Sequence, residues 1–318
     1  MTLVLALLLP GCDGVQSALA PAGSEAAALH GIWWVLITGA IVIWLALNGA
    51  FLCFTRIRPA PVHRRWGNAL ILGGGVAFPT LGLAALLLYT LPIMADLRVA
   101  AGTPAIHVRG EQWWWRISYL TPDGPVETAN ALRLPAGEET LISLDAAKVI
   151  HSFWVPSLAG KLDMFPGRVT YLPLEPSRAG IYRGQCAELC GDGHALMAFQ
   201  TIVMEPAEYR AWLAAEARPA EPPDNAAAER GQAVFMAEGC AGCHSIRGTP
   251  ANGSLGPDLT HFGSRPSIGA ATLENTPENL ALWLSRTGEV KPGVHMPGYA
   301  TLEPAPLADL VRYLEGLE

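Results

Sequence analysis

The chain has 318 residues, of which 51% are hydrophobic and 15% charged, and its formal net charge is −7. Acidic residues outnumber basic ones both in residues 96–217, by fourteen to ten, and in residues 218–318, by twelve to seven. This balance excludes the basic surface that nucleic-acid-binding proteins need. The apolar residues gather in the first hundred positions, which indicates a membrane-attached protein with a soluble remainder.

The N-terminal segment, residues 1–30, opens with an apolar run that ends in Leu-Pro-Gly before Cys12. This ending resembles the cleavage box of bacterial lipoproteins, in which the cysteine becomes the lipidated N-terminus. No Lys or Arg precedes the run, although a signal peptide normally carries one. Lipidation at Cys12 and an unprocessed start with an incidental cysteine therefore both stay open.

Two further stretches, residues 31–54 and 67–95, supply the roughly 20 apolar residues that a helix needs to cross a bilayer. The loop between them, residues 55–66, has four Arg and no acid, which predicts that it faces the cytoplasm. The soluble remainder then lies on the opposite, oxidising side. Cys53, inside the first span, is interpreted as a small apolar filler.

Residues 96–217 predict an all-β domain. Short stretches that alternate apolar and polar side chains are separated by turn signals such as Thr-Pro-Asp-Gly at residues 121–124. Many short strands at this spacing are typical of a Greek-key sandwich or barrel. The predicted strands are residues 117–119, 141–144, 149–156, 169–174 and 200–204, followed by a helix at 207–217.

A proline-rich segment, residues 218–225, is typical of a stiff linker. After it, residues 226–318 predict an all-α domain whose helices lie at 226–237, 277–287 and 306–316. Apolar residues recur there at three- and four-residue spacing. So small a helical core gains stability from a bound cofactor.

The helical domain contains a Cys-x-x-Cys-His motif, formed by Cys240, Cys243 and His244. This spacing attaches a c-type haem, because the two thiols add to the two vinyl groups of the porphyrin and the adjacent histidine reaches the iron. A disulfide beside a chance histidine is the alternative. The position on the oxidising side, in a domain of suitable size, favours covalent haem c.

A c-type haem needs a sixth iron ligand, usually methionine or histidine. Met296 is the only methionine after the motif, and its loop position between histidine and proline suits a ligand better than a core residue. His295 and His261 are the alternatives. The domain resembles small class I cytochromes c over its whole length, including Gly-Pro-Asp-Leu at residues 256–259.

A second cluster, in the β domain, contains Cys186, Cys190, His194 and Met197. Two thiolates, an imidazole and a thioether within twelve residues form a soft ligand set that selects copper over hard cations. The alternatives are a zinc site, which would not need the thioether, and a simple disulfide, which would explain neither the histidine nor the methionine. A copper site also requires another imidazole. His151 is the candidate, although a lone histidine in an apolar strand is more often a core residue.

Both segments match subunit II of the haem–copper oxidases, and the match extends back through the two-helix anchor. The resemblance implies a cupredoxin-like sandwich with the binuclear copper centre CuA, in which two cysteine thiolates bridge the coppers and each histidine completes one of them. The methionine and a backbone carbonyl are then axial ligands, and the glutamate carboxylate faces a magnesium site at subunit I. The residues implied are His151, Cys186, Glu188, Cys190, His194 and Met197.

Two further features bear on where electrons arrive. Gln-Trp-Trp-Trp at residues 112–115 resembles the aromatic patch of the family, which makes Trp113 the candidate for receiving electrons; an ordinary aromatic at the sandwich edge is the alternative. Lys148 stands where the family usually has an acid that steers basic cytochrome c. A tethered cytochrome needs less steering, because its linker keeps the local concentration high. We therefore expect docking within one chain.

The resemblance implies a cytochrome-c-fused subunit II of a caa3-type cytochrome c oxidase in a bacterial plasma membrane. Electrons would pass from a donor to haem c, then to CuA, then to the haem and copper of subunit I, where oxygen is reduced and protons are pumped. The chain then contains no catalytic residue of its own. Its expected partners are subunit I, subunit III and, as donor, an upstream cytochrome or quinol–cytochrome c reductase complex.

Two other functions are weighed against this one. A copper-containing nitric oxide reductase has a similar electron-transfer subunit, and only the metals of its catalytic subunit separate the two. A membrane-tethered metallochaperone is disfavoured, because copper delivery needs neither a linked haem nor complete CuA ligation.

Overall fold

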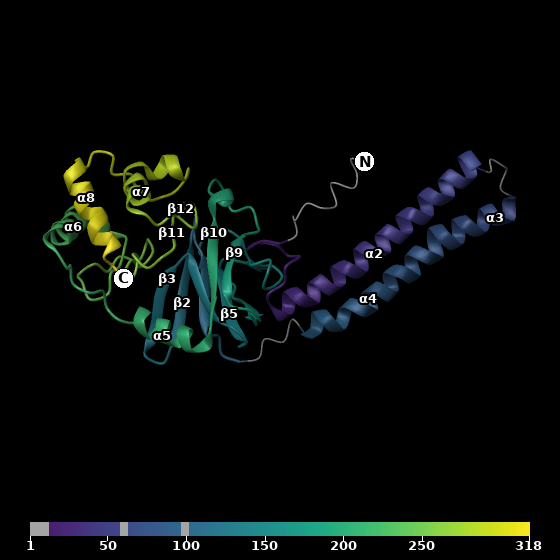
Figure 1. Cartoon of the computed structure of the whole chain (residues 1–318), viewed down its shortest axis with the longest axis horizontal. Coiled ribbons are helices and arrows are strands. Elements are labelled where there is room, and N and C mark those ends of the chain that lie inside the picture. Colours follow the sequence, from purple (N-terminus) through teal and green to yellow (C-terminus); the bar gives the residue numbers. More distant parts are fainter. Residues whose placement is uncertain (1–12, 58–62, 97–101) are drawn as a thin grey trace. The chain divides into compact units, whose positions relative to one another are not determined.

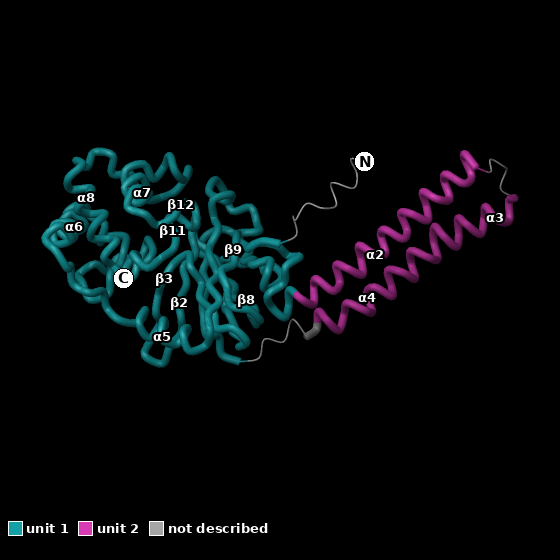
Figure 2. Tube along the Cα trace, in the orientation of Figure 1, with its two compact units in different colours: residues 1–26, 101–318 teal, residues 27–100 magenta. Residues whose placement is uncertain are grey.

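The structure is a computed structural model that describes residues 13–57, 63–96 and 102–318. Cys12, the predicted lipidation site, lies outside these residues. The chain forms two compact units (Figure 2). One contains residues 1–26 and 101–318, and the other contains residues 27–100.

The smaller unit is a pair of long apolar helices. The candidate membrane spans are Ser24–Ile57 and Arg64–Met94, and nearly all of their apolar side chains are exposed, as lipid-facing residues would be. Their parts are α2 Ser24–Leu52, the π-helical Cys53–Ile57, α3 Arg64–Ala69, the π-helical Leu70–Ala77 and α4 Phe78–Asp96. The first helix begins seven residues earlier than position 31, because alanines, which are strong helix formers, precede the hydrophobic run.

The larger unit begins with a two-layer β-sandwich (Figure 1). One sheet has the strand order β3-β2-β1-β5-β8 and the other has the order β4-β10-β9-β6-β7. The strands are β1 Ile106–Gly110, β2 Trp115–Thr121, β3 Gly124–Ala129, β4 Ala131–Pro135, β5 Thr140–Ala146, β6 His151–Trp154, β7 Leu162–Met164, β8 Thr170–Leu174, β9 Gly180–Cys186 and β10 Ala198–Met204.

The side chains between the two sheets form an aromatic core. Trp115 lies 5.0 Å from Phe199 and 5.9 Å from Phe153, measured between ring centroids, and all three are buried. Such aromatic contacts contribute beyond the apolar area they bury. The structure confirms the predicted all-β class, and it shortens the strand expected at 149–156 to β6. Five strands, β1, β3, β4, β7 and β9, were not predicted.

Helix α5 Pro206–Glu216 packs on the sandwich core. The helical part of this unit contains α6 Ala226–Ala237, α7 Pro277–Val290 and α8 Pro304–Glu315, with the short hairpin β11 Ser267–Ile268 and β12 Leu273–Glu274. The side chain of Asn225 caps α6, and that of Thr276 caps α7. Helices α6 and α8 cross at Gly231 (Figure 1). The predicted all-α class is confirmed; the domain boundaries at 217–218 and 225–226 stay predictions.

Candidate copper and haem sites

Strand pairing brings together the predicted copper ligands, which lie far apart in the sequence. His151 opens β6 and Cys186 closes β9, and these two strands pair antiparallel in one sheet. The chain then turns back, so that Cys190 and His194 follow in the next loop and Met197 directly precedes β10. All five side chains therefore meet at one end of the sandwich.

The distances among these groups suit a shared pair of metal ions. The sulfurs of Cys186 and Cys190 are 3.8 Å apart. Nδ1 of His151 lies 3.7 Å from the first sulfur, and Nδ1 of His194 lies 3.6 Å from the second. Sδ of Met197 is 3.8 Å from the sulfur of Cys190. Each thiol thus has its own imidazole, while the two thiols lie between them.

The His151 ring supports metal binding at this place. It is fully buried against Gly110, where an added Cβ would lie 2.6 Å from the ring. Its Nε2 is buried and finds no hydrogen-bond partner among the described residues, which is costly for a ring held only by packing. Nδ1 and the sulfurs of Cys186 and Cys190 all lie within 4.8 Å of one another. The donor set and its burial fit soft metal ions.

The two thiols differ in how readily they ionise. The adjacent Cys190 thiol, together with His151, holds the pKa of Cys186 well below its usual range. The proximity of Cys186 raises the pKa of Cys190. Metal binding requires thiolates, and the lowered pKa of Cys186 favours one thiolate within this pair.

Glu188 offers the site its backbone rather than its side chain. Its carbonyl oxygen lies 3.2 Å from the sulfur of Cys186, while its carboxylate accepts a hydrogen bond from the backbone N–H of Leu189. Among the described residues, the tight cluster of metal-binding atoms contains His151, Cys186 and Cys190 and not this carboxylate. The carbonyl therefore belongs to the cluster, and the carboxylate remains free for another role.

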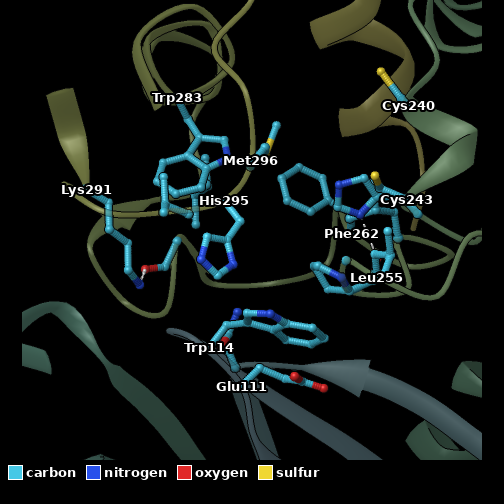
Figure 3. Close-up of a pocket in the computed structure, with 18 of the residues that line it drawn as sticks. Glu111, Trp114, Cys240, Cys243, Leu255, Phe262, Trp283, Lys291, His295 and Met296 are labelled. Atoms are coloured by element: carbon cyan, nitrogen blue, oxygen red, sulfur yellow. Dashed lines mark hydrogen bonds between the residues drawn. The ribbon is translucent and has the colours of Figure 1, made fainter. Parts of the chain in front are cut away.

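The second site is a cavity of about 560 Å³ on the helical part of the same unit (Figure 3). Its volume lies within the ~300–1,000 Å³ typical of small-ligand and cofactor sites. Cys240, Cys243, His244 and Met296 all line it. The sandwich contributes the opposite wall, where Figure 3 shows Trp114 facing the side that carries Met296.

His244 is oriented as a metal ligand. Its Nδ1 lies 2.8 Å from the carbonyl oxygen of Pro257, an acceptor that requires the proton on Nδ1 and leaves Nε2 free to coordinate. Burial lowers the pKa of His244, which favours the neutral ring. Gly256 makes room for it, because an added Cβ there would lie 2.6 Å from the imidazole. Both motif cysteines are free thiols.

The three candidates for the sixth ligand differ in their positions. Met296 and His295 line the cavity, whereas the ring nitrogen Nε2 of His261 lies 3.0 Å from the carbonyl oxygen of Arg218. The ring of His295 faces Trp113, with 5.9 Å between centroids. Met296 lines the cavity and also packs against the hydrophobic core of this domain, so it remains the first candidate for the sixth ligand.

Trp113 lies between the two sites. Its Nε1–H donates a hydrogen bond of 2.8 Å to the carbonyl oxygen of Cys190, and its ring neighbours His295. Gly193 packs on the indole face, where an added Cβ would lie 2.6 Å from the ring. The side chain is buried between the copper-ligand loop and the cavity wall. Lys148 lines the same cavity.

Two cations in this region were not predicted. Arg265 is buried, lines the cavity and donates to the carbonyl oxygen of Asp258, while its Nε finds no partner among the described residues. Lys291 is buried and donates to three carbonyl oxygens. No sequence pattern marks either residue, because their partners are backbone groups from distant segments.

Comparisons with known proteins agree with this geometry. A family model described as cytochrome c oxidase subunit II, periplasmic domain, matches residues 123–206, and a cytochrome c model matches residues 228–318. Cytochrome c oxidase subunit 2 of Alkalihalophilus pseudofirmus is 33% identical over 332 residues, covering 99% of this chain and 95% of the relative. The chain belongs to the cytochrome c oxidase subunit II family. It carries a C-terminal cytochrome c domain.

Other relatives have the same description. Subunit 2 of Bacillus sp. strain PS3 is 33% identical, covering 76% of this chain and 70% of that protein. The periplasmic domain of subunit II from Bradyrhizobium japonicum is 28% identical, with a TM-score of 0.35, and covers 37% of this chain and 96% of that structure. The sequence relatives thus identify the chain as subunit II of a cytochrome c oxidase, and its two soluble domains imply copper and haem c. The two apolar helices fit a membrane anchor with these domains on the outer side.

Proposed function

We propose that this subunit II passes electrons from a donor, through haem c and then a binuclear CuA centre, to the haem and copper of subunit I, where oxygen is reduced and protons are pumped. One observation carries the proposal. Trp113 contacts both sites at once, through its hydrogen bond to Cys190 and its ring contact with His295, next to Met296. The two sites are thus neighbours in one compact unit.

The copper pair would be held by the sulfurs of Cys186 and Cys190, with His151 and His194 at its two ends. Met197 and the Glu188 carbonyl would complete it, and the Glu188 carboxylate would face a magnesium ion at subunit I. When bound, the centre supplies one-electron redox chemistry with small structural change. The chain's own contribution is a rigid, dry site: three of these six residues, His151, Cys186 and Met197, lie in or directly beside paired strands, and His151 is fully buried.

The haem would be attached through Cys240 and Cys243 and ligated by His244 and Met296. When bound, it supplies one-electron transfer between the donor and the copper domain. The Pro257 carbonyl fixes the His244 ring, and the unpartnered Nε of buried Arg265 offers a cation to the haem carboxylates. The apolar lining, which includes Leu259 and Phe262, excludes water from the cavity.

The remaining parts of the proposal concern the complex. We place the copper domain at 96–217, the linker at 218–225 and the cytochrome domain at 226–318, outside a bacterial plasma membrane. Subunits I and III are the expected neighbours, and an upstream cytochrome or quinol–cytochrome c reductase complex is the expected donor. Lipidation at Cys12 would add a second membrane attachment.

The test is to purify the complex in mild detergent and to measure copper, covalent haem and extractable haem per chain. We expect three coppers, two from this chain and one from subunit I, together with one covalent haem c, and haem A in the extract. Haem B alone would contradict the oxidase assignment and point to the nitric oxide reductase. In Cys186→Ser, the two coppers of this chain should be lost while haem c is kept. The matched control, Cys53→Ser in the helical anchor, should keep both.

A further inference from the structure

Lys291 is a charged residue that is almost completely buried in the larger unit. It follows α7 directly, its exposure is 1%, and its ammonium group lies among backbone oxygens. Its Nζ donates to the carbonyl oxygens of Trp113 at 2.7 Å, Leu196 at 2.8 Å and Gly269 at 2.8 Å. The chain's two other lysines, Lys148 and Lys161, are exposed.

These contacts use the full donor capacity of the group. An ammonium has three N–H donors and no acceptor, and each of the three is matched by one carbonyl. Burial lowers the pKa of Lys291 to about 7, and the nearby Cys190 opposes this shift. A buried charge is tolerated only where it is fully hydrogen-bonded.

Two of the three acceptors belong to the copper domain, and both lie beside its ligands. Trp113 is bonded to Cys190, and Leu196 directly precedes Met197. The third acceptor, Gly269, belongs to the cytochrome domain itself. Lys291 therefore obtains all of its partners only when the cytochrome domain lies on the copper domain.

The hairpin loop that supplies the third carbonyl is shaped for this contact. Gly269, Ala270 and Ala271 all have left-handed φ values, of 64°, 65° and 58°, which is uncommon for alanine. In this conformation the Gly269 carbonyl meets Lys291, while the Ala270 carbonyl accepts a 3.3 Å hydrogen bond from the backbone N–H of Ala198 on β10. Strained backbone of this kind persists where surrounding contacts hold it.

The position of Lys291 also determines what lies on Trp113. Gly293, with φ of 81°, packs on the indole and on Asp192, and an added Cβ would lie 3.0 Å from the ring. His295 follows, 5.9 Å from the indole ring, and Met296 comes next in the chain. The segment from Lys291 to Met296 thus crosses the tryptophan that is hydrogen-bonded to Cys190.

We propose that Lys291 is a latch: a positioning residue that fixes the chain's own cytochrome domain on the Trp113 face of the copper domain. Arg116 and Arg247 support it at the rim, where they donate to the carbonyl oxygens of Ser254 and Glu127 across the same interface. The consequence of the latch for electron transfer rests on the proposed function. The docking itself does not.

The docking test is amide hydrogen exchange in the whole purified complex, with Lys291→Met compared with the wild type. The substitution keeps an unbranched side chain that is one atom shorter, and it leaves three carbonyls without a donor. Exchange of the Ala198 amide, which is bonded to Ala270, should accelerate by about 10- to 100-fold, because each hydrogen bond to a charged group is worth about a factor of ten or more. Amides within β5 should be unchanged.

Two further variants separate a latch from general charge attraction. Lys161→Met, the same change at an exposed lysine, should leave the Ala198 amide unchanged. Lys291→Arg keeps the charge, but its planar fork does not match three convergent carbonyls, so it should also accelerate exchange. Unchanged exchange in Lys291→Met, or full protection in Lys291→Arg, would overturn the latch.

The functional readout uses the same complexes. In Lys291→Met, electron transfer from haem c to copper should slow, while soluble cytochrome c should reduce the copper centre faster because the Trp113 face is uncovered. The haem and copper spectra should not change, which distinguishes a positioning role from damage to either site. Absence of haem-to-copper transfer in the wild type would refute the proposed function, whereas the exchange experiment would still decide the latch.

Discussion

Substitution of Gly231 by alanine should destabilise the cytochrome domain. Gly231 lies where α6 crosses α8, and an added Cβ would lie 2.6 Å from the carbonyl carbon of Asp309 and 2.7 Å from Cβ of Tyr313. Both distances are below the 3.0 Å at which neighbouring atoms must shift. The obstacle is backbone and a Cβ, so no side-chain rotation relieves it and the helices must separate.

The expected loss in the free energy of unfolding follows from the contacts that this separation disrupts. Phe235 on α6 packs on Tyr313 on α8 with 5.9 Å between ring centroids, and both side chains are buried. Overpacking lowers the free energy of unfolding by roughly 1–3 kcal/mol. Because no side-chain movement relieves the clash at this helix crossing, we expect a loss of about 3 kcal/mol. For a domain of this size, that corresponds to a shift of roughly 1 M in the guanidinium midpoint.

The assay is guanidinium unfolding of the purified complex, followed by the visible absorption band of haem c, which is separate from the band of the haems in subunit I and so reports on the cytochrome domain. The matched control is Gly288→Ala in α7, where an added Cβ meets no described atom within 4 Å. Alanine is favoured over glycine in a helix by about 1 kcal/mol, so this variant should be slightly more stable. Equal midpoints for Gly231→Ala and the wild type would refute the packing argument.

Three other predictions concern the copper domain. Trp113→Phe removes the hydrogen bond to Cys190 and should slow haem-to-copper electron transfer in flash experiments with both metal contents unchanged; an unaltered rate would exclude Trp113 from the route. Tyr119→Phe removes the buried hydroxyl that accepts from the Arg133 backbone N–H at 2.7 Å, so thermal unfolding should show a loss of about 1–2 kcal/mol, and no loss would contradict that bond's role. Chelation of copper should lower the melting temperature of the sandwich and release two titratable thiols, including that of Cys186; the same thiol count before and after chelation would argue against thiolate ligation.

The sequence was most informative where the chemistry is encoded locally. The Cys-x-x-Cys-His motif and the run from Cys186 to Met197 each lie within one short segment, so residue type and spacing sufficed to propose a haem and a copper site. His151 was different. A lone histidine in an apolar strand is more often a core residue than a ligand. His151 approaches Cys186, 35 positions away in the sequence, only because β6 pairs with β9.

The contacts that could not be predicted from the sequence are made by backbone carbonyl groups, which every residue carries. Lys291 is bound by backbone carbonyls at Trp113, Leu196 and Gly269, and no residue type signals a carbonyl in the right place. Strand β9 was missed because its glycines at 180 and 184 interrupt the alternation; the second of them makes room for the Phe199 ring. Local patterns thus indicated the two sites, whereas the contact between them needed the fold.

The most direct test of the central claim is time-resolved electron transfer in the purified complex after rapid photoreduction of haem c. The account predicts that reoxidation of haem c and reduction of the copper centre share one rate, which is independent of the concentration of the complex. Copper reduction that lags behind haem reoxidation, or a rate that rises in proportion to concentration, would contradict transfer between the two sites of one chain.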